Sequence, residues 1–187
     1  YYIPDRVQEG YGLKIPVIDQ FKNRNIKLII TVDCGISDIE QIAYAQSIGI
    51  DTIVLDHHEI ADQLPVAVAC INPNRSDCSF PFKHLAGVGI AFNFLIALRG
   101  SLRKENFWKN GQYPNLKEYL DVVALGTIGD IAPLVGENRI LAKIGLELIT
   151  EGKRPGIRAL KEVSGIDGQL IDSFKASFCL IPRINAA

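Results

Sequence analysis

The sequence predicts an α/β fold, with a mainly parallel sheet flanked by helices and followed by a helical segment. Two continuous apolar runs, 26–33 and 50–56, each end in an aspartate. Unbroken apolar runs of this length are typical of parallel strands that are buried on both faces. A helical stripe lies between them, and further helical patterns follow. This alternation of strand and helix indicates a parallel sheet.

The helix between the two strands has recognisable ends. Ser37 and Glu40 have the spacing of a capping box, which marks the start of a helix. Apolar residues recur at helical spacing after it, and Gly49 marks the end. Residues 27–55 are therefore predicted to form a β-α-β unit with a right-handed crossover.

The elements that follow are predicted in chain order. A third strand over 66–73 ends at Pro73, and a loop leads to a mostly buried helix over 85–100. A polar connector covers 101–115, and the next helix begins at 116 and stops near Gly126–Gly129. An amphipathic helix over 138–152 ends at Gly152, and a short helix begins with Pro155 in its first turn.

Composition excludes several classes of protein. The 187 residues are 48% apolar and 22% charged, which fits a packed core and not a disordered chain. The net charge of −1 provides no overall attraction to nucleic acid, so such binding needs a local cluster of cations. No membrane-length apolar run or signal-peptide pattern is seen, and four cysteines without a C-x-x-C pair favour a reduced, cytoplasmic setting.

Acidic and imidazole side chains follow the two strands where each strand ends. Asp33 closes the first strand, and Asp56, His57 and His58 close the second. If these strands are neighbours, their ends lie about 5 Å apart, at the edge where ligands bind in open α/β sheets. A divalent cation would remove the repulsion between the carboxylates. Asp and His ligands favour Mn²⁺, allow Mg²⁺ and make Zn²⁺ less suitable.

Each acid also has an ordinary explanation. Asp33 and Asp56 could cap the helices or turns that follow them, and His58 could be a surface residue. Asp130, which follows two glycines in "LGTIGDIAPL", could be a turn residue before Pro133. The ordinary explanation is weaker for Asp33 and Asp56 together, because two successive strands would have to end in acids by chance.

Three segments in this order resemble the DHH phosphoesterase superfamily: "TVDCG", "LDHHE" and "LGTIGDIAPLVGENR". Within it, "YYIPDR" and "PRINAA" resemble the bacterial exonucleases that degrade single-stranded DNA from a 5′ end. The resemblance implies Mn²⁺ or Mg²⁺ as cofactor, two per complete active site. It also implies a single-strand-binding protein and a repair helicase as partners.

The resemblance implies a role for individual residues. Asp33, His57 and Asp130 match metal ligands, with Asp33 shared between two ions. Asp56 matches a residue that orients a histidine, and His58 one that faces the scissile phosphate. Four further residues are candidates for binding the substrate: Arg6 and Arg183 at a 5′-phosphate, Asn185 beside them, and His84. An ion pair of Arg6 with Asp5 or Glu9, and a loop role for His84, remain open alternatives.

One part of the family pattern does not occur in these residues. The first motif, an Asp-x-Asp pair, is not found, and Asp33, His57 and Asp130 suffice for about one cation. We therefore expect residues 1–135 to form an incomplete catalytic core. Residues 136–187 are expected to form a helical connector towards a further domain. The fragment alone is expected to bind one metal weakly and to be nearly inactive.

Two other functions are compatible with these residues. One is a different enzyme of the superfamily, a phosphodiesterase for short oligonucleotides or cyclic dinucleotides, or a Mn²⁺ pyrophosphatase. The other is a non-catalytic binding module in DNA replication that has kept the fold. The retention of Asp33, Asp56, His57, His58 and Asp130 argues against the second.

Overall fold

The computed structural model describes residues 1–5, 7–61 and 63–186, which form two compact units. The first covers Tyr1–Lys83 and the second His84–Ala187. This division by packing differs from the expected limits of 1–135 and 136–187. Packing does not by itself define a functional domain, so the expected limits stay a prediction.

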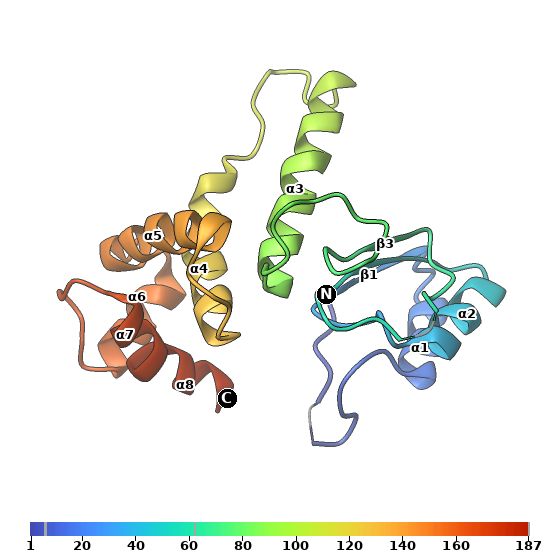
Figure 1. The fold of residues 1–187 in the computed structure, drawn as a ribbon, viewed down its shortest axis with the longest axis horizontal. Helices are drawn as coiled ribbons and strands as arrows, with labels where there is room; N and C mark the ends of the chain where they lie inside the picture. The colour runs from blue at the N-terminus through green and yellow to red at the C-terminus, as the bar shows by residue number, and fades with distance from the viewer. Residues whose placement is uncertain (6, 62, 187) are drawn as a thin grey trace. The chain divides into compact units, whose positions relative to one another are not determined.

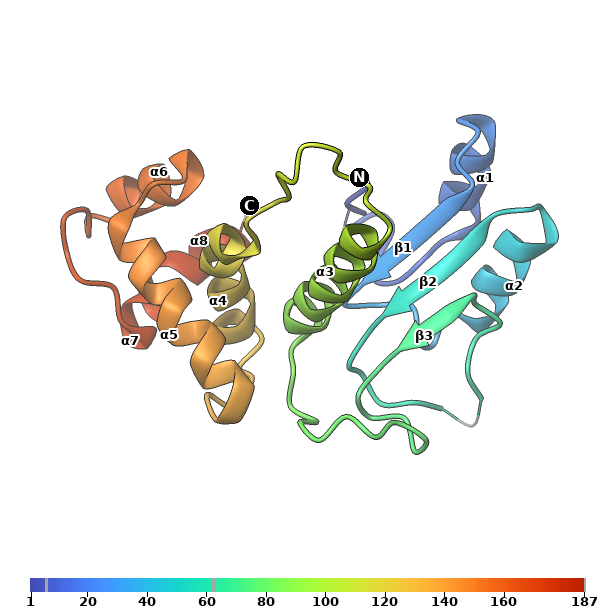
Figure 2. The ribbon, with the colours of Figure 1, turned by 90° about the horizontal axis from the view of Figure 1, so that it is seen from above.

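The first unit is a parallel sheet with helices on one face. Its strands are β1 (Leu28–Val32), β2 (Asp51–Leu55) and β3 (Ala69–Ile71), in the order β1-β2-β3. The register pairs Leu28 with Asp51 and Val32 with Leu55, so β1 and β2 end level with one another. Helices α1 (Ile15–Asn23) and α2 (Ile39–Ser47) pack together on the sheet (Figures 1 and 2). The predicted β-α-β unit is therefore confirmed.

The core of this unit lies between the helices and one face of the sheet. Ile18 of α1 and Ile42 of α2 pack against Ile29 and Val54 of the strands. The opposite face of β1 is 43–47% exposed at Leu28, Ile30 and Val32. The expectation that this strand is buried on both faces is therefore wrong, because α1 and α2 cover only one face.

Some predicted details of the first unit also differ. Helix α2 begins at Ile39 and has no side-chain cap, so the capping box of Ser37 and Glu40 does not form. The carboxylate of Asp38 instead accepts the backbone N–H of Leu13 at 2.7 Å. β3 is shorter than the predicted 66–73. Helix α1 was not predicted, although Pro16 in its first turn is a typical helix-start signal.

The second unit is helical. Its elements are α3 (Gly87–Lys104), a 3₁₀ turn η1 (Leu116–Tyr119), α4 (Leu120–Gly129), α5 (Gly136–Glu151), α6 (Pro155–Val163), α7 (Ser173–Lys175), a π-helical turn η2 (Ala176–Leu180) and α8 (Ile181–Asn185). The predicted stop of α4 at Gly129, the end of α5 at Gly152 and the start of α6 at Pro155 are confirmed.

Helix α3 departs from its prediction in length and burial. It continues four residues past 100 into the predicted connector. Its buried residues are confined to its first two turns, whereas Leu95, Ile96 and Leu98 are each about 40% exposed. The expectation of a mostly buried helix is therefore wrong. Among the described helices, none combines the length and the apolar character that crossing a bilayer requires.

Candidate metal centre

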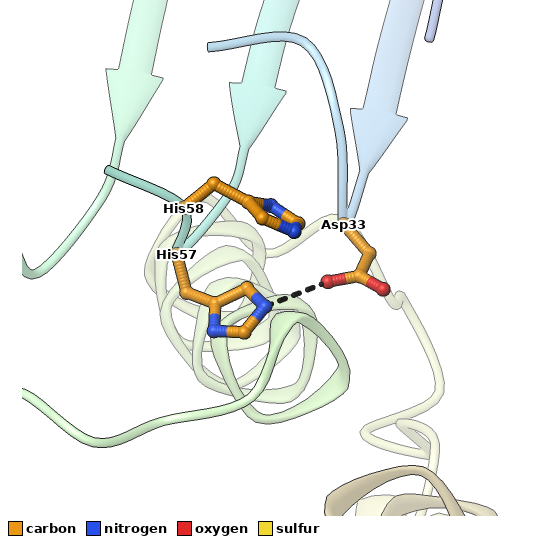
Figure 3. Close-up of side chains that lie close together, drawn as sticks. All are labelled: Asp33, His57 and His58. Carbon is orange, nitrogen blue, oxygen red and sulfur yellow. Dashed lines mark ion pairs between the residues drawn. The ribbon is translucent and has the colours of Figure 1, made fainter. Parts of the chain in front are cut away.

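The site begins where β1 and β2 end, because the hydrogen-bond ladder continues one residue beyond each strand. The N–H of Asp33 donates to the carbonyl of Leu55 at 2.9 Å, and the N–H of Asp56 donates to Ile71 at 3.1 Å. Asp33 has a φ of +62°, in the left-handed region that Asp and Asn tolerate better than most residues. The backbone thus turns sharply at Asp33 and leaves its side chain beside the end of β2 (Figure 3).

Three side chains gather at this edge of the sheet. Oδ1 of Asp33 lies 3.1 Å from Nε2 of His57. One ligand atom from each of Asp33, His57 and His58 can be chosen so that all three lie within 4.8 Å of one another. The two imidazole rings have centroids 4.6 Å apart (Figure 3). The structure therefore brings together two of the three predicted metal ligands and the predicted phosphate-facing histidine.

Asp56 lies beneath this cluster and is only 1% exposed. Its Oδ1 accepts the backbone N–H of His57 at 2.8 Å and lies 2.6 Å from Nδ1 of His58. Its Oδ2 accepts the N–H of Ile36 at 3.0 Å. Burial would raise the pKa of this carboxyl group. The hydrogen bonds from His58 and Ile36 outweigh burial and keep the pKa below its usual value. Asp56 is therefore a buried carboxylate that orients His58.

Substituting Asp56 by Asn is expected to destabilise the protein by about 1–3 kcal/mol, because an amide cannot accept hydrogen bonds at both ends. Urea unfolding measures this effect. Asp51→Asn, an exposed carboxylate at the opposite end of β2, is the matched control and should stay within about 0.5 kcal/mol of the parent. Equal stability of the two variants would contradict the structural role of Asp56.

Three residues that sequence reasoning missed also shape the site. Nδ2 of Asn72 donates to the carbonyl of His58 at 2.9 Å, and Nδ2 of Asn74 donates to that of His57 at 2.6 Å. The hydroxyl of Tyr11 donates to the carbonyl of Asp33, and its ring meets His58 edge-on at 5.7 Å. The sequence "INPN" places Asn72 and Asn74 directly after the third strand, at the same edge of the sheet, and this position could have identified them as site residues.

The glycine after Cys34 allows the turn that positions Asp33. Gly35 has a φ of +108°, and a Cβ built on it would lie 2.5 Å from Oγ1 of Thr31 and 3.3 Å from Val54. A side chain would therefore be strained in conformation and would also collide with the sheet. This glycine lets the chain fold back tightly over the end of β1.

The other predicted site residues that the structure describes belong to the second unit. Asp130 is the exposed C-cap of α4 in the second unit, and its N–H donates to Gly126 at 2.9 Å. The carbonyl of the exposed His84 accepts from the buried Asn138 at 2.6 Å. Arg6 lies outside the described residues. The roles of Asp130, His84 and Arg6 stay predictions.

Arg183 and Asn185 both belong to α8. Nη1 of Arg183 donates to the carbonyl of Cys179 at 2.5 Å, one turn earlier. Asn185 lines a groove of about 630 Å³ together with Gly129, Ile131 and Phe178. Ile131 holds a φ of +56°, which is strained for a β-branched residue and fixes the turn directly after Asp130. The part that Arg183 and Asn185 take in substrate binding stays a prediction.

Known proteins resemble this chain over its whole length. The family model "DHH family, N-terminal domain" matches residues 1–127. The single-stranded-DNA-specific exonuclease RecJ of Salmonella typhimurium is 50% identical over 190 residues, which cover 100% of this chain and 33% of that protein. The chain thus spans about a third of the length of this relative.

Two solved structures are also similar. A crystal structure of exonuclease RecJ bound to manganese matches with a TM-score of 0.82 and 35% identity, over 100% of this chain and 44% of that one. RecJ from Thermus thermophilus in complex with Mn²⁺ matches with a TM-score of 0.75 and 32% identity, over 93% and 24%. Both support the α/β fold that the sequence predicts.

Proposed function

This chain belongs to the DHH family, and on that premise we propose that it carries the metal-binding part of an exonuclease. The proposed reaction is hydrolysis of phosphodiester bonds in single-stranded DNA, proceeding from the 5′ end. The observation that carries the proposal is the cluster of Asp33, His57 and His58 at the ends of two adjacent parallel strands. Similar proteins that are named single-stranded-DNA-specific exonucleases support the choice of single-stranded DNA as substrate.

The donor atoms of the cluster fit a divalent cation. A carboxylate and two imidazoles suit Mn²⁺ well, and Mg²⁺ accepts the carboxylate. We propose that Asp33 and His57 hold the cation and that Asp130 supplies a further ligand, with two cations in each complete site. A cation there would neutralise charge on the phosphate and lower the pKa of a water molecule that attacks it. The manganese-bound structures of similar proteins support this choice of metal.

The chain's own residues position the reacting groups. Asp56 accepts from Nδ1 of His58, which fixes the tautomer in which Nε2 of that ring carries the lone pair. The ring of Tyr11 contacts the ring of His58 edge-on and restricts its rotation. Asn72 and Asn74 fix the backbone beneath both histidines. His58 is thereby preorganised to stabilise charge on the scissile phosphate or to donate a proton to the leaving oxygen.

The proposed substrate contacts and partners extend beyond this cluster. We propose that Arg183, with Arg6, holds the 5′-phosphate through paired N–H donors. Asn185 would support the same contact, and His84 would touch the strand. A single-strand-binding protein and a repair helicase are the proposed partners, in the cytoplasm.

Digestion of end-labelled DNA tests the proposed activity. With Mn²⁺, the complete protein is expected to release label from a 5′-labelled single strand at once and to shorten a 3′-labelled strand stepwise. Duplex DNA, pyrophosphate and dinucleotides serve as competing substrates. Release from the 3′ end first, or hydrolysis of pyrophosphate alone, would refute the proposal in favour of another enzyme of the superfamily. If a His57→Ala variant digested DNA at the rate of the parent, the activity would come from a contaminating nuclease, and the chain would be a non-catalytic binding module.

A further inference from the structure

An exposed aromatic cluster lies in the loop that follows α3, in the second unit. The rings of Phe107 and Trp108 meet edge-to-face at 5.2 Å, and those of Trp108 and Tyr113 lie 6.3 Å apart. Phe107 is 64% exposed and Tyr113 is 40% exposed. Side chains of this kind usually go to a core or an interface, so their presentation to solvent points to a binding surface.

Two arginines lie near the ring of Tyr113. The guanidinium carbon of Arg103 lies 4.8 Å from the ring centroid of Tyr113, and that of Arg99 lies 5.9 Å from it. Residues 99–113 contain four lysines and arginines and one carboxylate, Glu105, which gives this short stretch a net charge of +3. The whole chain has a net charge of −1, so positive charge is concentrated here.

These cations are not neutralised by neighbouring acids. In the described part of the chain, no ion pair joins Arg99, Arg103, Lys104 or Lys109 to a carboxylate. The hydrogen bond of Arg99 goes instead to the carbonyl of Pro114, at 3.0 Å. The four charges therefore remain available to an anionic ligand.

Ordinary structural roles account for only part of this arrangement. Arg103 and Lys104 lie in the last turn of α3, where cations are favoured by the helix dipole. Stacking of Arg99 and Arg103 on Tyr113 also helps to fix the loop. Neither role explains why Phe107 is held in solvent or why Lys109 lies two residues after it. A ligand that offers both phosphates and flat apolar faces would explain both the exposed Phe107 and the nearby Lys109.

We infer that the end of α3 and the loop 105–115 form an additional binding surface for single-stranded DNA (Figure 1). Exposed bases would stack on Phe107 and Tyr113, while Arg103, Lys104 and Lys109 would contact phosphates. Duplex DNA would not satisfy the aromatic rings, because its bases are already stacked. The inference rests on the proposed function and extends it, since none of these residues belongs to the metal cluster.

Binding of an intact strand tests the inference directly. The complete protein is titrated in EDTA with fluorescent dT30, and fluorescence anisotropy gives the Kd at several salt concentrations. Arg103→Glu/Lys109→Glu is expected to weaken binding about 10-fold or more. It should also lower the slope of log K against log salt by about 1.4, for two lost phosphate contacts. Phe107→Ala is expected to weaken binding about 5-fold or more through lost stacking.

A matched control separates this surface from a general charge effect. Lys143→Glu/Arg158→Glu changes the net charge equally at exposed helical positions of the same unit and should leave the Kd within about twofold. In the digestion assay, the Arg103/Lys109 variant should raise KM for dT30 while kcat at saturating DNA stays unchanged.

Three results would overturn the inference. The first is an unaltered Kd in both the Arg103/Lys109 and the Phe107 variants. The second is an equal loss of affinity in the control. The third is a result in which the Arg103/Lys109 and Phe107 variants bind dT30 as the parent does but no longer bind a peptide of acidic and aromatic residues that the parent binds. That result would make the surface a protein-docking site. Failure of the proposed function would appear separately, as a parent protein that binds dT30 but does not shorten it.

Discussion

Asp33→Asn is expected to reduce hydrolysis of single-stranded DNA by at least about 100-fold and to weaken Mn²⁺ binding by a similar factor. Asp33 provides the carboxylate of the cluster, and its Oδ1 lies 3.1 Å from Nε2 of His57. An amide keeps the shape of the side chain but removes its negative charge. The cluster then loses the carboxylate that would compensate part of the charge of a divalent cation.

Asn is the sharpest replacement at this position because the backbone of Asp33 is left-handed, with a φ of +62°. Asn tolerates that conformation, whereas Ala would add strain of about 1 kcal/mol and would confuse lost binding with altered folding. Electron paramagnetic resonance measures the Mn²⁺ affinity of the Asn variant, and circular dichroism measures its thermal unfolding. We expect the substitution to change the first and not the second. The melting temperature is expected to stay close to that of the parent.

Asp51→Asn is the matched control for this experiment. Asp51 is an exposed carboxylate that pairs in register with Leu28, at the opposite end of the sheet from Asp33. Its removal should change neither Mn²⁺ binding nor activity. If both variants bound Mn²⁺ as the parent does, the metal would have to lie elsewhere.

Gly145→Ala is expected to destabilise the protein by about 3 kcal/mol, the upper end of the usual cost of overpacking. Gly145 lies in α5, on the side of this helix that packs against α4. A Cβ at this position would lie 2.1 Å from the carbonyl oxygen of Leu120 and 2.4 Å from Cβ of Ala124. The first contact is with backbone, which cannot rotate away, so the two helices would have to separate.

The gain in helix propensity from Gly to Ala, about 1 kcal/mol, acts in the opposite direction and is too small to compensate. Gly100→Ala in α3 isolates that gain, because a Cβ there would meet nothing within 4 Å. Urea unfolding should show Gly100→Ala to be more stable than the parent and Gly145→Ala less stable. Similar midpoints for the two variants would show that α4 and α5 are not packed as described.

The predictable part of this molecule is the part that local sequence controls. Apolar runs that end in Asp33 and Asp56 predicted two parallel strands, and the register of β1 and β2 shows that these strands are neighbours whose ends lie level. The gathering of Asp33, His57 and His58 follows from that register. Gly152 and Pro155 marked helix ends correctly, because their backbone preferences need no tertiary context.

The unpredicted part depends on contacts between segments far apart in the chain. Helix α2 begins after Asp38, whose carboxylate bonds to Leu13, 25 residues away, and the local pattern of Ser37 and Glu40 carries no sign of this tertiary contact. Asn72, Asn74 and Tyr11 reach the site only because β3 and the chain before α1 return to the ends of β1 and β2. The argument from strand ends does not extend to Asp130, because it caps a helix.

Anomalous diffraction from crystals of the complete protein grown with MnCl₂ tests the central claim most directly. We predict a manganese peak in contact with the carboxylate of Asp33 and Nε2 of His57, with Nδ1 of His58 still bonded to Asp56. A strong manganese peak elsewhere, with Asp33 and His57 making no contact to it, would contradict the account.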